Sequence, residues 1–209
     1  MVDRVTFNCP SCGSPLQKRF QFSKFIVCDY CRVSLILEDE AVHNAGYASV
    51  AMDIPSILEL NKQFEYRGWK FIPLGRVQYS YGRGVWDEWW VMDFQGAGKW
   101  VSTDEGDVAI EEGVELDYGI PSYDMLNVGG HITLSIDGQS MSGVVAEKNV
   151  CEMVGAAGEL PFQVIPNETY EYADILLTNR KIITFEYFKD EANCYFGQWV
   201  DPFDIKGFS

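Results

Sequence analysis

Four cysteines near the N-terminus have the spacing of metal ligands. They form two C-x-x-C pairs, which are Cys9 with Cys12 and Cys28 with Cys31. Two residues between cysteines let both sulfurs face one ion, and two such turns give the tetrahedral sulfur coordination typical of zinc. Four thiolates close the coordination shell and leave no position for a catalytic water. We therefore predict a zinc ribbon over residues 1–37 that holds a structural Zn²⁺.

Other kinds of site also use paired cysteines. A lone C-x-x-C pair is typical of redox dithiols, and four cysteines can hold iron, alone or in a cluster. The sequence around the pairs lacks a thioredoxin-like βαβ pattern, which favours zinc. A ribbon of this size has too little core to fold alone, and metal binding would supply on the order of 10 kcal/mol. Cys151 and Cys194 lie among apolar neighbours and are predicted to be buried.

Acidic residues within aromatic segments are the second set that could carry chemistry. They are Asp87, Glu88, Glu159 and Glu186. A carboxylate among apolar rings has either a raised pKa or a basic partner, for which Arg76 and Arg180 are candidates. Paired carboxylates could hydrolyse a glycoside by acid–base catalysis. Equally, they could lie on the solvent face of a strand, where alternation places polar residues.

Tryptophan is abundant in the same region. The six are Trp69, Trp86, Trp89, Trp90, Trp100 and Trp199. Large rings fill sheets and pair across strands, so core packing is the first interpretation. Because Trp89 and Trp90 are adjacent, a regular strand points them to opposite faces. Either both faces are covered, or one ring faces outward and recognises a sugar, a cation or a partner protein.

Other catalytic signatures are missing from the sequence. His43 and His131 have no serine or cysteine nucleophile motif nearby, which argues against a catalytic triad. The stretch from Gly96 to Lys99 fails as a phosphate loop, because Asp93 stands in place of the first glycine and no helix follows. The acidic tract at residues 104–117 lacks calcium-loop spacing and is predicted to be a solvated loop. No catalytic residue is assigned.

The charge distribution limits the partners. The net charge is −15, while residues 1–37 hold five basic and two acidic residues, so the remainder carries −18. An acidic body repels phosphate, and nucleic-acid binding is not expected. No apolar run reaches the roughly 18 residues of a membrane span, and the N-terminus lacks a signal-peptide pattern. Together with cysteines in metal-ligand spacing, this predicts a cytoplasmic protein.

Beyond the ribbon, the pattern predicts a linker at residues 38–53 and a mainly β body at 54–209, with possible halves at 54–116 and 128–208. One short helix is predicted at 55–64, with Pro55 near its start. Tight turns indicate an antiparallel, barrel-like sheet. Strands are predicted at 69–81, 85–94, 99–102, 132–136, 142–147, 162–165, 173–177, 181–188, 194–200 and 203–205. A turn is predicted at 147–149, and within the ribbon a hairpin of 16–20 with 22–27.

Short motifs in this body resemble one known family. Gly75-Arg76 with Tyr79 precedes Trp86 to Trp89, and Gly158-Glu159-Leu160-Pro161 precedes Glu186 and Tyr195 to Gly197. Their order is similar to that of the bacterial domain of unknown function family 4178, over residues 54–205. A preceding zinc ribbon is a familiar arrangement in that family, and no biochemical activity is established for it. The resemblance implies that the gene for this protein lies beside genes for envelope stress and polyamine metabolism.

Three hypotheses follow. The first is a non-enzymatic interaction or assembly module of a bacterial stress-related system, with a protein partner. The second is a binding protein for a small cationic ligand such as a polyamine, and the third is a carboxylate-dependent hydrolase. The candidate ligand or partner surface comprises Arg76, Tyr79, Glu88, Trp89, Trp100, Glu159 and Glu186.

Overall fold

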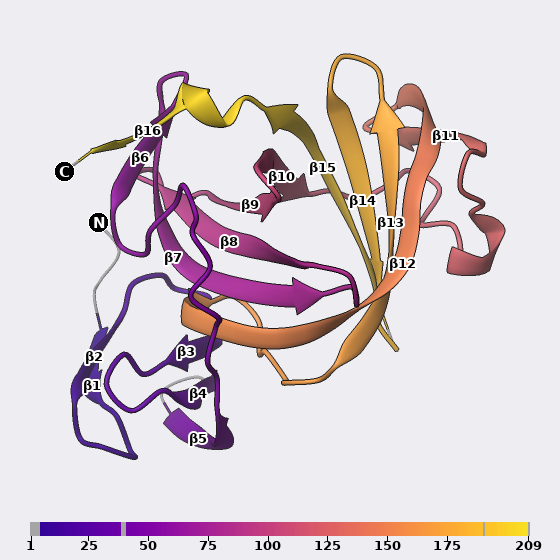
Figure 1. The fold of residues 1–209 in the computed structure, drawn as a ribbon. Coiled ribbons are helices and arrows are strands. Elements are labelled where there is room, and N and C mark those ends of the chain that lie inside the picture. The colour runs from indigo at the N-terminus through magenta and orange to yellow at the C-terminus, as the bar shows by residue number, and fades with distance from the viewer. Residues whose placement is uncertain (1–4, 39–40, 190, 209) are drawn as a thin grey trace.

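The regular secondary structure of the protein consists almost wholly of antiparallel strands (Figure 1). The computed structural model describes residues 5–38, 41–189 and 191–208. Over these ranges the helical elements are two short 3-10 turns, η1 (Tyr123–Met125) and η2 (Pro202–Asp204). No helix in the described part of the chain has the length and apolarity to cross a bilayer. The predicted mainly β, antiparallel fold is confirmed.

Eight strands close into a barrel. In order around the ring they are β7 (Trp69–Ser80), β8 (Val85–Asp93), β9 (Gly98–Asp104), β10 (Asp107–Gly113), β15 (Ala192–Val200), β14 (Lys181–Tyr187), β13 (Thr169–Leu177) and β12 (Gln139–Leu160). The ring is complete because β12 pairs with β13 along one part of its length and with β7 along another. Strands from both predicted halves therefore surround one interior, which we call the lumen.

Closure of the barrel depends on bends in its two longest strands. Figure 1 shows β12 as one long, strongly bent ribbon. The register shifts between Val145 and Glu147 in β12, and between Pro73 and Gly75 in β7. Such bulges bend a strand and increase its twist. At the crossing of β7 and β12, a Cβ on Gly75 would collide with the carbonyl oxygen of Glu159, so only glycine allows this approach.

Two further layers cover the outside of the barrel. On one side, β6 (Gln63–Tyr66) pairs with β7 and with β16 (Ile205–Phe208), and Leu58 packs beside them. On the other side, β11 (His131–Ile136) pairs with β12, and Leu126 joins the outward side chains of β13, β14 and β15 in a second cluster. Both faces of the barrel strands are thus largely covered, so aromatic residues on either face become buried.

The cysteine-containing module is a set of short strands at one end of β12 (Figure 1). β1 (Val5–Asn8) pairs with β2 (Pro15–Lys18), while β3 (Phe25–Val27), β4 (Val33–Glu38) and β5 (Ala41–Ala48) pair in that order. β3 also pairs with the last residues of β12, so the module continues the barrel sheet. Its own small core contains Leu16, Ile26 and Leu35 with Cys9 and Cys28.

Several predictions of local structure were wrong. No helix forms at 55–64: an irregular backbone brings Leu58 onto the barrel, where it is 4% exposed, and packing outweighs the marginal stability of a short helix. β12 runs through the predicted turn at 147–149, because a bulge absorbs the irregularity. Residues 162–165 form a loop, in which Val164 is buried without strand pairing.

Three other differences concern pairing and exposure. β2 pairs with β1 rather than with residues 22–27, because β3 is taken up between β4 and β12. The predicted linker contains the strand β5. The acidic tract at 104–117 is not a solvated loop throughout: it includes β10, where Glu111 is only 6% exposed. Partners distant in sequence account for two of these differences, because β3 is held by β12 and β10 pairs with β15, whereas β5 pairs with the adjacent β4.

Candidate functional site

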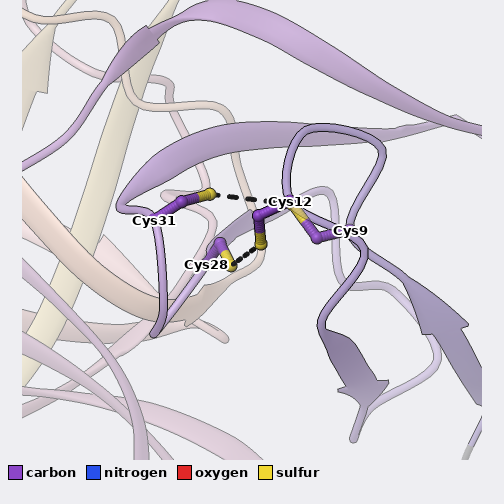
Figure 2. A group of neighbouring side chains, drawn as sticks. All are labelled: Cys9, Cys12, Cys28 and Cys31. Carbon is purple, nitrogen blue, oxygen red and sulfur yellow. Dashed lines mark hydrogen bonds between the residues drawn. The ribbon is translucent and has the colours of Figure 1, made fainter.

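The four N-terminal cysteines lie together as a candidate metal centre (Figure 2). Their sulfur atoms all lie within 4.8 Å of one another, and the Cys9–Cys31 and Cys12–Cys28 sulfur pairs are each 3.8 Å apart. Metal–sulfur bonds of about 2.3 Å in a tetrahedron place sulfurs about 3.8 Å apart, whereas a disulfide needs about 2.05 Å. The arrangement fits one tetrahedral ion held by all four side chains.

Local backbone geometry explains why these residues converge. The N–H of Gly13 donates to the carbonyl of Cys9 at 2.8 Å, and the N–H of Arg32 donates to the carbonyl of Cys28 at 2.9 Å. Each pair is thereby folded into a tight turn, and both closing residues have positive φ, 77° and 61°. Glycine adopts this conformation freely, while Arg32 does so at a cost of roughly 1 kcal/mol. The predicted turns are confirmed.

The second candidate site is the barrel lumen, and strand alternation determines which residues reach it. Neighbouring residues on a strand point to opposite faces. On β8, Trp90 belongs to the core cluster inside the barrel, whereas Trp89 belongs to the outer cluster with Val91. Glu88 therefore points inward with Trp90. The register sets Glu88 opposite Ser102 of β9 and Trp90 opposite Trp100, so these four side chains share the lumen face.

Six carboxyl groups line one cavity of this lumen, among them Asp104 and the exposed Glu147. The other four come from four different strands: Glu88 of β8, Glu111 of β10, Asp174 of β13 and Glu186 of β14. Glu111 and Glu186 are 6% and 7% exposed, and the other two are partly buried. Over the ranges that the structure describes, no lysine or arginine forms an ion pair with any of them. The lumen thus concentrates acidic groups, and the basic residues that line its cavities, Lys99, Arg180, Lys181 and Lys189, form no ion pair with these four.

Neutral donors hold these carboxyl groups in place. Trp86 Nε1 donates to Glu88 at 3.1 Å, and the Tyr170 hydroxyl donates to Glu186 at 3.3 Å. The Thr184 hydroxyl lies 3.0 Å from Glu111 and 2.9 Å from Asp174. A hydroxyl has one proton to donate, so it can satisfy both contacts only if one of the two carboxyl groups is protonated and donates in turn.

Burial determines the protonation state of these four carboxyl groups. Loss of water, and then the charge of the nearby Glu186 carboxylate, raise the pKa of Glu88 to about 8. Desolvation, followed by the charge of Glu111, likewise raises the pKa of Glu186 to about 8. Desolvation is also the main cause that raises the pKa of Glu111 to about 8 and that of Asp174 to about 7. Near neutral pH these groups therefore hold protons that a cation could displace.

Two cavities open inside the barrel and share the side chains of Glu88 and Glu186. The first chamber has a volume of about 650 Å³ and is lined by aromatic rings that include Trp90, Trp100 and Tyr195. The second chamber, of about 590 Å³, is lined by Glu111 and Asp174 together with Trp86 and Tyr172. Volumes of this size suit small organic molecules. Aromatic faces beside carboxylates are also the usual surroundings of bound organic cations.

The predicted surface residues fall into three separate places. Glu88, Glu186, Trp100 and Tyr79 line the first chamber. Arg76 and Trp89 face outward: Arg76 forms a two-pronged ion pair with Asp87, at 2.8 and 2.7 Å, and its guanidinium lies 5.0 Å from the Trp89 ring centroid. The seventh predicted residue, Glu159, lies at the junction with the ribbon. The seven predicted residues therefore do not form one surface.

Glu159 is an anchor between the barrel and the ribbon. It is 1% exposed, and its carboxylate accepts the backbone N–H of Arg19 at 2.9 and 3.0 Å and that of Phe20 at 3.3 Å. Desolvation raises the pKa of Glu159, while these backbone donors oppose that shift. Its neighbour Gly158 has a φ of 74°, which lets the chain turn against β7. The Gly158–Pro161 motif thus has a structural explanation.

The sequence analysis missed two lumen residues, Glu111 and Asp174. Glu111 lies in the acidic tract assigned to solvent, although the preceding Val108-Ala109-Ile110 is a strand signal. Asp174 lies between Ala173 and Ile175, both 0% exposed, so alternation alone could have placed it on the opposite, lumen face. Cys151 and Cys194 are 1% and 4% exposed, as predicted.

Comparison with known proteins identifies a family but no characterised relative. The family model described as a domain of unknown function (DUF4178) matches residues 60–202, which span β7 to β15 and so the whole barrel. No curated protein matches the chain, and no solved structure does.

Proposed function

We propose that the barrel of this chain, which belongs to the DUF4178 family, binds a small organic cation, held in the lumen by Glu88, Glu111, Asp174 and Glu186. The observation that carries the proposal is the set of four inward carboxyl groups with no basic partner among the described residues. Burying such groups is costly unless a cation compensates them. A protein that served only as scaffold would be more stable with apolar residues there.

The geometry favours an organic cation over a metal ion in the lumen. Within the described residues, only the four cysteines form a group of potential ligands close enough to hold one ion. The lumen carboxylates are spread over two adjoining chambers between aromatic walls. An extended cation with several ammonium groups, such as a polyamine, would match this distribution, because each charge can meet a different carboxylate while the alkyl segments contact rings.

A hydrolase fits the lumen less well. Acid–base catalysis by two carboxyl groups requires environments that separate their pKa values, so that one is protonated and the other ionised. Here desolvation raises the pKa of both Glu88 and Glu186 to about 8, in the same direction. Neither group is set apart as the ionised base or nucleophile.

We further propose that the metal of the cysteine site is zinc and that it is structural. All four sulfurs are needed to complete a tetrahedron, which leaves no open position for substrate. Such a site requires reduced thiols, which fits a cytoplasmic location. Metal analysis by mass spectrometry of the purified protein should give one zinc per chain, and a stoichiometric iron content instead would contradict the assignment.

The ligand proposal is tested by thermal denaturation in the presence of a panel of small molecules. Diamines, spermidine, quaternary ammonium compounds and guanidinium compounds should raise the melting temperature of the wild type in proportion to their affinity. Neutral sugars and nucleotides serve as comparison. The same cations should have a much smaller effect on Glu88→Gln. A rise in melting temperature with nucleotides but with no cation would contradict the proposal. So would cations that raise the melting temperature of Glu88→Gln as much as that of the wild type.

One observation favours the interaction module as a second candidate. Tyr30, between the second pair of cysteines, is 68% exposed on the ribbon and belongs to none of its buried clusters. Exposed tyrosines are frequent at protein interfaces. A photo-crosslinking residue at position 30 should then capture one protein reproducibly in cells of the source organism. Capture of no specific protein would contradict a docking role for this end of the ribbon, including one in a stress-related system.

A further inference from the structure

The ribbon contributes directly to the rim of the first chamber. Residues 19–24, between β2 and β3, form a loop that reaches the barrel, and its Phe22 lines the chamber together with Trp90 and Phe162. The Phe22 ring meets Trp90 edge-on, with 6.4 Å between centroids, although Phe22 is 49% exposed. An aromatic ring that is half exposed and still packed on a lumen residue marks the boundary between the chamber and solvent.

Three contacts fix this loop to the barrel. Phe20 is 1% exposed and packs against both Phe22 and Trp90, with centroid distances of 5.2 and 6.1 Å. The Glu159 carboxylate accepts the N–H groups of Arg19 and Phe20. The N–H of Lys24 donates to the carbonyl of Leu160 at 3.0 Å. The position of Phe22 is therefore determined by the backbone on both sides of it.

The same loop is tied at both ends to the cysteine site. β2 follows the turn that contains Cys9 and Cys12, and β3 ends at Val27, directly before Cys28. Cys28 is 0% exposed and lies in the small ribbon core with Ile26. An ion held by both cysteine pairs would thus fix the separation of the two strands from which the loop extends.

We propose that the ribbon is a metal-dependent rim of the ligand chamber, with Phe22 as a ligand-contacting residue and Glu159 as the residue that positions it. This inference rests on the proposed cation-binding function of the lumen. When the cysteine site holds its ion, the loop keeps Phe22 over Trp90 and narrows the mouth of the chamber. Without the ion, β2 and β3 are no longer held together at the cysteine site, and the loop keeps only its contacts with the barrel, so Phe22 is held less firmly.

Coupling of this kind is reciprocal. If the metal-bound ribbon improves the affinity of the lumen for a cation by some factor, the cation must improve retention of the metal by the same factor. Coupling between sites typically amounts to 5–150-fold, that is about 1–3 kcal/mol. We expect a value toward the lower end, since a single ring and one loop transmit it. A purely structural ribbon, by contrast, would leave ligand affinity unchanged as long as the barrel stays folded.

The test uses the full-length, metal-loaded protein with spermidine as the probe. Calorimetric titration gives the dissociation constant for the wild type and for Phe22→Ala, which keeps all four cysteines. Tyr30→Ala is the matched control, because it removes an exposed aromatic ring from the same ribbon but away from the chamber. Phe22→Ala should weaken spermidine binding at least fivefold, and Tyr30→Ala should leave it unchanged.

The second part of the test asks whether the cation improves retention of the metal. It measures the rate at which a chromogenic chelator removes the metal. Saturating spermidine should slow that rate several-fold in the wild type but much less in Phe22→Ala. Equal affinities of wild type and Phe22→Ala, together with an unaffected chelation rate, would overturn the coupling while leaving the lumen proposal intact. If the metal-loaded wild type does not bind spermidine at all, the proposed binding of this cation in the lumen is itself contradicted. The coupling proposal, which depends on that binding, is then contradicted as well.

Discussion

Replacement of Glu186 by glutamine should stabilise the protein in alkaline solution while it weakens cation binding. The change keeps the shape of the side chain and one oxygen that can accept from Tyr170, whose hydroxyl is 3.3 Å from Glu186 Oε1. It removes only the ability to ionise. In a scaffold carboxylate the same change would be neutral or destabilising, so the sign of the effect distinguishes the two roles.

The magnitude follows from the pKa. Desolvation, and then the charge of Glu111, raises the pKa of Glu186 from 4.5 to about 8. Because the folded state binds this proton more tightly than the unfolded state, the contribution to stability is complete below about pH 4.5 and is lost as pH rises to about 8. Each pKa unit corresponds to about 1.4 kcal/mol, so the loss has a ceiling of roughly 5 kcal/mol. Glutamine has no such loss.

Thermal unfolding in ligand-free buffer at several pH values measures this difference. At pH 9, Glu186→Gln should melt several degrees above the wild type, because 1 kcal/mol corresponds to about 2–4 °C in a chain of this size. At pH 5 the two should differ little. Glu59→Gln is the control, since Glu59 is exposed and pairs only with Lys62 outside the barrel. A variant less stable than wild type at pH 9 would show that Glu186 is ionised and favourably paired, and would refute the reasoning.

Three further predictions concern the metal site, the barrel closure and the outer face. Cys28→Ser should lose the bound metal and several kcal/mol of stability, because Cys28 is 0% exposed and closes the ribbon core; metal analysis and melting temperature measure both. Gly75→Ala should destabilise by more than about 2 kcal/mol in denaturant unfolding, since its Cβ would meet Glu159 and Leu160, whereas Gly113→Ala, with its nearest neighbour at 4.0 Å, should not. Asp87→Asn should cost about 3–5 kcal/mol by leaving Arg76 buried without its partner, yet leave spermidine affinity unchanged because this pair faces away from the lumen.

The metal-site geometry and many strands could be predicted from local sequence. The cysteine spacing and the turn residues Gly13 and Arg32 act over a few residues, so the pattern alone specifies the two turns. The aromatic, β-branched segments of β7, β8 and β9 are likewise joined by short turns. In these cases the partner strand lies next in sequence, and the local signal is sufficient.

The barrel itself could not be derived in this way. Its closure depends on β12 leaving β13 and pairing with β7, and residues such as Gly158 and Gly75 meet there although they are far apart in sequence. Packing of Leu58 on the barrel, which is also non-local, explains why the segment before β6 is irregular rather than helical. Alternation in the sequence suggested that Glu88 and Glu186 face either solvent or a core, but only ring closure puts both in one lumen with Glu111 and Asp174.

The most direct test of the account is the number of protons released when a cation enters the lumen. Calorimetric titration of spermidine at about pH 7, in buffers with different ionisation enthalpies, gives that number. Because the pKa values of Glu88, Glu111 and Glu186 are raised to about 8 and a bound cation lowers them, each binding event should release at least about one proton. Affinity should accordingly rise with pH up to about 8, and release should fade above pH 9. Binding without proton release, with an affinity that does not change between pH 6 and pH 8, would contradict the claim that these carboxyl groups hold the ligand.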